Sequence, residues 1–291
     1  MKRRGILQSR SGAWLLASLL LLPGVGCGPA ESPEAEAGLE EAELESRRRA
    51  VREMFQVLGV AGSAGQWTQV AVGNMFQFQD VLEPATIEQL QAAATEAYAP
   101  GPLLDQMVEH YVEHYDEQAV LALLEYFRSP AGKALAEAAI VQPQEDGSTS
   151  LDSFLAVMAK TPPSEDRLGL ADRMMAASRQ DEQAVDTLLS VSRTNLRAVE
   201  PLLPARVSDE AIAEREAEIR QRLMERARQQ AALSSLYSVR DLDDEALRSH
   251  VEFTESGYYR WYVEQLGPAV ERAIGSAGSL LRSRVSELSA G

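Results

Sequence analysis

The chain is poor in cysteine, in aromatic residues and in positive charge, and each shortage excludes a class of protein. Cys27 is the only cysteine among 291 residues, so an internal disulfide framework is excluded. The 28 basic residues stand against 44 acidic ones, and the net charge of -16 argues against nucleic acid as a partner. Aromatic residues make up only 6%, but hydrophobic residues reach 45%, which suffices for packed cores, and the length suits two modest domains.

The hydrophobic run near the N-terminus is too short to cross a membrane. Basic residues at 2–4 precede roughly ten apolar residues at 13–22, and Pro23 ends the run. A transmembrane helix needs about 20 apolar residues. Residues 1–26 are therefore predicted to be an export signal peptide.

The four residues that follow the run, Gly-Val-Gly-Cys at 24–27, resemble the lipobox of bacterial lipoproteins. Gly24 departs from the pattern, because the family prefers Leu there. The resemblance implies that Cys27 is acylated and tethers the protein to a membrane, where each buried CH₂ contributes about 0.8 kcal/mol. Gly28 implies sorting to the outer membrane, with the protein facing the periplasm. Cleavage after Ala30, giving a soluble periplasmic protein, is the alternative.

The segment after the cysteine is acidic. Residues 27–46 contain no basic residue, and we predict a flexible, solvated tether there. Four arginines follow between 47 and 52. Because Glu43 precedes Arg47 by four residues, ion pairs on a helix surface are favoured over contacts with lipid headgroups.

The body of the chain has the periodicity of α-helices. Between Leu103 and Tyr115 the apolar residues fall on one helical stripe, and no stretch of similar length alternates as a strand would. That stripe consists of Leu104, Met107, Val108, Tyr111 and Tyr115. Further along, Ser208 is placed to cap a long helix. The predicted fold class is all-α.

Two segments share one pattern at a constant offset of 127 residues, 116–129 and 243–256. Each begins with an aspartate suited to cap a helix and ends in a serine followed by a helix-breaking residue. We therefore predict a helix, a sharp corner and a second helix in each segment.

This repeat predicts two related helical bundles in tandem. They would occupy residues 47–160 and 165–288, with the second a divergent copy of the first, separated by the break at 161–164. A short helix at 151–160 would close the first bundle, with Phe154 packing back on it.

The first copy carries Tyr-Phe-Arg-Ser-Pro-Ala-Gly at 126–132, after the acidic cap at Asp116. This block resembles the bacterial domain-of-unknown-function family 2059, clearly over residues 103–139. The second copy departs from the motif at 254–258. The resemblance implies a helical fold in an exported protein, and it brings no established activity.

The pattern His110-x-x-Glu113-His114 has the form found in one class of zinc peptidases, because two histidines four residues apart can chelate one ion. The alternative is that these residues border the buried stripe of an ordinary helix. Because no strands are evident, we favour the second interpretation and predict no metal, no cofactor and no catalysis. His250 is interpreted as a helix-flank or core histidine.

The densest aromatic cluster is at 258–262. Tyr258, Tyr262 and Leu266 form a helical stripe typical of core packing, and an exposed patch for a partner or a glycan is the alternative. Together these patterns predict a lipid-anchored interaction or scaffold module that contacts an envelope protein.

Overall fold

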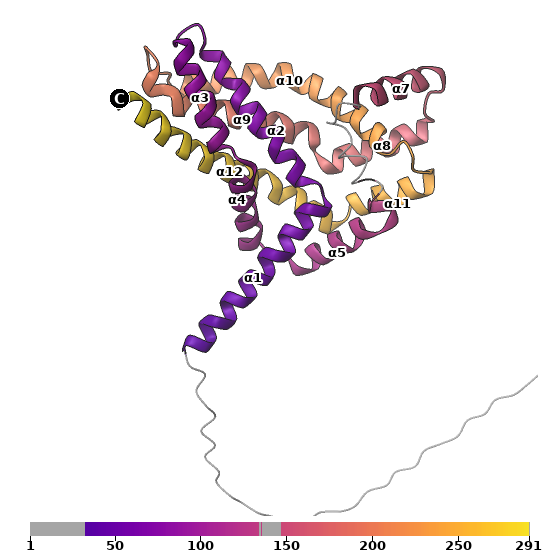
Figure 1. Ribbon diagram of the computed structural model, residues 1–291. Helices are drawn as coiled ribbons and strands as arrows, with labels where there is room; N and C mark the ends of the chain where they lie inside the picture. Colours follow the sequence, from indigo (N-terminus) through magenta and orange to yellow (C-terminus); the bar gives the residue numbers. More distant parts are fainter. Residues whose placement is uncertain (1–32, 134, 136–146, 291) are drawn as a thin grey trace, which may run out of the picture. The chain divides into compact units, whose positions relative to one another are not determined.

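All regular structure in the computed structural model is helical over the residues that it describes, 33–133, 135 and 147–290 (Figure 1). This confirms the all-α class. Cys27 and the predicted signal peptide lie outside the described residues. None of the described helices is long and apolar enough to span a membrane. The α-helices are α1 (Pro33–Val57), α2 (Val60–Gly73), α3 (Pro84–Ala97), α4 (Pro100–Glu113), α5 (Glu117–Arg128), α7 (Gly147–Lys160), α8 (Glu165–Ser178), α9 (Gln180–Val199), α10 (Asp209–Ser238), α11 (Asp244–Thr254) and α12 (Gly257–Ala290), with short 3₁₀ helices at Asn74–Phe78 and Glu200–Leu202.

The chain divides into two compact units, residues 1–41 and 42–291. Helix α1 begins at Pro33, so the helix starts inside the segment predicted to be a flexible tether. The reason is local, since alanine and glutamate dominate this stretch and both are strong helix formers. The predicted pair of Arg47 with Glu43 forms, and Arg48 reaches across to Glu109 of α4 at 2.8 Å.

Helices α5 and α11 have the same capping geometry. Asp116 accepts a hydrogen bond from Ala119 N at 2.9 Å, and Asp243 accepts one from Ala246 N at 2.8 Å. After each helix a serine caps the next turn. Ser129 Oγ accepts from Gly132 N at 3.2 Å, and Ser256 Oγ accepts from Tyr259 N at 3.3 Å. Both segments therefore form the expected helix and corner, and helical residues follow each corner, at 130–133 and in α12.

Described residues that follow each corner contact the opposite half of the chain. Helix α12 packs mainly against α4 and α9, and it also contacts α3 and α5 (Figure 1). Leu135, which follows the first corner, packs with Leu170, Val239 and Leu247 of the second half. At the crossing, the equivalent rings of Tyr126 and Phe253 stack with centroids 3.8 Å apart.

The predicted division into two tandem bundles is therefore not confirmed, because residues of both halves share one core. An amphipathic helix buries its apolar face wherever apolar surface is available, and sequence order does not decide where that is. The packing predicted for Phe154 is wrong for the same reason. Its ring lies 5.3 Å from that of Tyr237 on α10, in the second half.

One buried amide joins three helices of the core. Asn195 on α9 is completely buried, and its Nδ2 donates to Ala71 O at the end of α2 at 3.0 Å. Its Oδ1 accepts from the hydroxyl of Tyr98, which caps α3, at 2.8 Å. The bond to Ala71 satisfies a carbonyl that the helix end leaves without an intrahelical partner.

Candidate binding cleft

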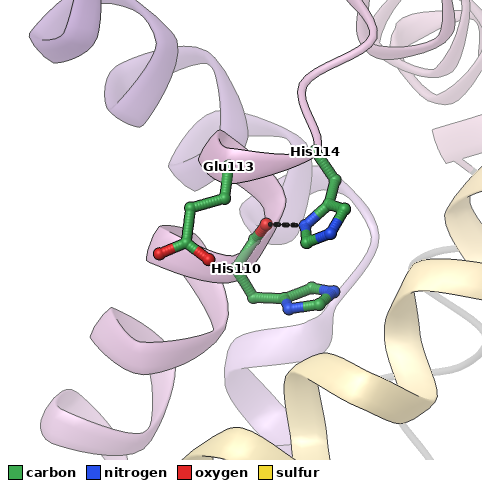
Figure 2. Close-up of side chains that lie close together, drawn as sticks. All are labelled: His110, Glu113 and His114. Carbon is green, nitrogen blue, oxygen red and sulfur yellow. Dashed lines mark hydrogen bonds between the residues drawn. The ribbon is translucent and has the colours of Figure 1, made fainter.

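The three residues of the predicted zinc motif lie together at the C-terminal end of α4 (Figure 2). Atoms suited to metal coordination on His110, Glu113 and His114 are within 4.8 Å of one another. The two imidazole rings stack with centroids 4.4 Å apart, while Figure 2 shows the carboxylate of Glu113 on the other side of the helix turn. The motif thus brings three suitable donor atoms close together, with the carboxylate and the imidazoles on different sides of the turn.

Each of these side chains also has a protein partner. His110 Nε2 lies 3.1 Å from Gln265 Oε1, and His114 Nδ1 donates to His110 O at 2.9 Å. Glu113 accepts from Arg272 at 2.6 Å, and this hydrogen bond lowers the pKa of the Glu113 carboxyl. Burial lowers the pKa of His110. An ion bound at His110 Nε2 would therefore have to displace Gln265, whereas Arg272 occupies only one of the two carboxylate oxygens of Glu113.

A cleft with two adjoining lobes is bordered by residues of α2, α8, α9, α10, α11 and α12. The first lobe has a volume of about 540 Å³ and the second about 520 Å³. Both volumes fall in the range of small-ligand sites, about 300–1,000 Å³. We refer to them as the inner and outer lobes. They share a wall that consists of Ser63, Gln66, Trp67, Gln180, Gln183 and Leu266.

The inner lobe is lined by uncharged side chains. Among the described residues that border it there is no aspartate, glutamate, lysine or arginine. Its polar groups are hydroxyls and amides, which include Ser63, Gln66, Ser178, Gln183, Ser234 and Ser238. Its apolar side includes Trp67, Phe127, Met174 and Leu266. In a chain this acidic, a charge-free cavity distinguishes the site from the rest of the surface.

The titratable groups of the inner lobe are neutral at pH 7. Burial lowers the pKa of His250 to about 4, and its Nδ1 lies 2.8 Å from the hydroxyl of Tyr126. Burial raises the pKa of Tyr259 to about 12, and it also raises the pKa of Tyr262. His250 Nε2 has no hydrogen-bond partner among the described residues, and the histidine borders the cavity. It therefore offers the lobe a neutral imidazole nitrogen.

The aromatic cluster at 258–262 contributes to this cleft in a different way from the prediction. Tyr262 is buried and borders the inner lobe with Tyr259 and Leu266. Tyr258, which the predicted stripe included, is 44% exposed. The buried face of α12 is therefore displaced by about one residue from the predicted stripe, because contacts with α4 and α9 decide which side chains of α12 are covered.

Sequence reasoning missed Trp67 and the glutamines that share its wall. The available signal was the composition of 60–73, where small and uncharged residues replace the charges typical of a surface helix. Comparison of the chain with family models, curated proteins and solved structures finds no match. The resemblance to domain-of-unknown-function family 2059 stays a prediction.

Proposed function

We propose that this protein is an exported, lipid-anchored and non-enzymatic binding protein that holds an uncharged ligand in the cleft. The observation that carries the proposal is the neutral lining of the inner lobe, on a chain with a net charge of -16. A charged ligand would lose its hydration there without gaining an opposite charge, which is costly. An uncharged ligand would exchange water for hydroxyl and amide partners.

The leader and Cys27 support the anchored part of the proposal. We expect labelled fatty acid to be incorporated into the wild-type protein in bacterial cells and not into Cys27→Ser, with fractionation placing the wild type in the outer membrane. Wild-type protein without label, or a mature N-terminus beyond residue 27, would contradict the anchor.

Two glycines of α2 provide a matched test of the binding site. Neither Gly62 nor Gly65 has an atom within 4 Å of an added Cβ, but only Gly62 borders the cleft. We expect Gly62→Phe to fill the inner lobe and Gly65→Phe to leave it open, with both proteins folded.

The assay compares two fluorescent dyes that share a ring system, uncharged phenylnaphthylamine and anionic anilinonaphthalene sulfonate. The expected result is that the uncharged dye binds to wild type and to Gly65→Phe, binds weakly to Gly62→Phe, and binds better than the sulfonate. Equal binding of the two dyes, or binding that Gly62→Phe leaves unchanged, would refute the neutral cleft.

Metal binding is the second candidate, and it is favoured by the proximity of the donor atoms of His110, Glu113 and His114. The test is metal analysis of the purified protein together with a zinc titration. Stoichiometric zinc that disappears in His110→Ala would support this candidate, and a peptidase would in addition lose activity in Glu113→Gln. If zinc uptake is the same in wild type and His110→Ala, the candidate fails.

A further inference from the structure

The wall shared by the two lobes combines an indole with several carboxamides. Helix α2 contributes Gln66 and the half-buried Trp67, while α9 contributes Gln180 and Gln183. Because this wall borders both lobes, a ligand that passes from one lobe to the other lies against it. The wall is thus the part of the cleft best placed to recognise an elongated ligand.

These polar groups are not used by the protein. The carboxamides of Gln66, Gln180 and Gln183 have no hydrogen-bond partner among the described residues, nor has the indole N–H of Trp67. Of the three, Gln183 is half-buried, whereas Gln66 and Gln180 are exposed. The cleft therefore presents three free amide groups and one free N–H beside an aromatic surface.

This combination matches the chemistry of a sugar. Each sugar hydroxyl both donates and accepts, as does a glutamine carboxamide, and the C–H face of a sugar ring is apolar enough to cover an indole. A hydrocarbon chain would remove water from the same amides without replacing its hydrogen bonds, which is unfavourable. We propose that the wall at Trp67 is a subsite for an uncharged saccharide chain, an inference that rests on the proposed binding function.

The charges of the outer lobe agree with a neutral sugar. Asp186 and Glu271 border this lobe, and no lysine or arginine borders it among the described residues. Asp186 forms an ion pair with Arg220 of α10. Acidic sugars would meet carboxylates in the outer lobe and an uncharged lining in the inner one, so both lobes select against anionic saccharides.

The test uses Trp67 as a fluorescent reporter. The sequence has three tryptophans, so the full chain with Trp14→Phe and Trp261→Phe retains Trp67 as its only indole. The probes are triacetylchitotriose and cellotriose as uncharged saccharides, trigalacturonate as an anionic one, and monodecanoylglycerol as an uncharged amphiphile. We expect the uncharged saccharides to change the Trp67 emission in a saturable way and trigalacturonate to have little effect.

Substitutions assign the binding to the wall. Gln183→Ala in the reporter chain should weaken the affinity for the bound saccharide about tenfold, as expected for the loss of hydrogen bonds to one side chain. Gln221→Ala is the matched control, because Gln221 lies on the exposed surface of α10 and does not border the cleft. The affinity of the Gln221→Ala protein for the saccharide should equal that of the reporter chain without this substitution.

The outcomes separate this inference from the proposed function. If monodecanoylglycerol binds and neither uncharged saccharide does, the saccharide subsite is refuted while a neutral cleft stands. If none of the uncharged probes binds, both proposals fail. Saccharide binding that Gln183→Ala and Gln221→Ala affect equally would also overturn the subsite, because the wall would then not contact the sugar.

Discussion

Acidification should destabilise the protein through His250. The pKa of this side chain is about 4 in the folded state, against an ordinary value of 6.5, because burial disfavours the imidazolium. Between these two values the unfolded chain binds a proton that the folded chain does not. The contribution of the neutral histidine to the free energy of unfolding is therefore complete above pH 6.5 and decreases as the pH falls toward 4.

The size of the effect follows from the two pKa values. One pKa unit corresponds to about 1.4 kcal/mol, so lowering the pH from 7.5 to 4.5 should remove about 2.5 kcal/mol of the free energy of unfolding. Urea unfolding at a series of pH values measures it. His250→Leu is the control, since Leu123 occupies the equivalent position of the first copy and is fully buried.

Carboxylates titrate in both proteins, so the informative quantity is the difference between the two curves. Wild type should lose about 2.5 kcal/mol more than His250→Leu over this interval. Equal losses in the two proteins would show that His250 is not buried in a neutral form, and the charge-free lining of the inner lobe would then be wrong.

Five further substitutions test the packing and one helix cap. A methyl group at Gly278 would overlap the γ-methyl of Thr194 where α12 contacts α9, so Gly278→Ala should lower the free energy of unfolding by about 1–3 kcal/mol in thermal or urea unfolding. Gly275→Ala places its methyl group in open space and should stabilise the protein by about 0.5–1 kcal/mol. The reverse order would refute the close approach of α9 and α12 at Gly278. Asn195→Ala should cost about 1–3 kcal/mol for each buried group it leaves unpaired, and a change below 1 kcal/mol in urea unfolding would show that these bonds do not matter. Asp243→Ala should cost about 1 kcal/mol by the same assay, whereas Asp243→Asn, which retains a capping oxygen, should cost much less.

Much of the secondary structure could be predicted from local pattern. The stripe between Leu103 and Tyr115 predicted α4, and Ser208 caps α10 by accepting from Ala211 N at 3.1 Å. The break at 161–164 separates α7 from α8. These features depend on residues within a few positions of one another, so a short window of sequence contains the necessary information.

The candidate site was predictable only where its residues are neighbours in sequence. His110 and His114 stack because four residues make one helical turn, although the pattern gave no sign that Arg272 would bind Glu113. The cleft needed α2, α9, α10 and α12 to meet, and Gln66 is more than a hundred residues from Gln180 and Gln183 in the sequence. No local pattern contains that information.

The sequence by itself determined that the chain is helical, where several helices begin, and which aspartates and serines cap them, since these choices follow from hydrogen bonds between near neighbours. Only the tertiary structure decided that α12 packs on helices of both halves, α4 and α9, because an apolar stripe specifies that it will be buried but not by which partner. The same long-range packing excludes water around His250 and brings Trp67 beside Gln183. It thereby produced the neutral cleft on an acidic chain.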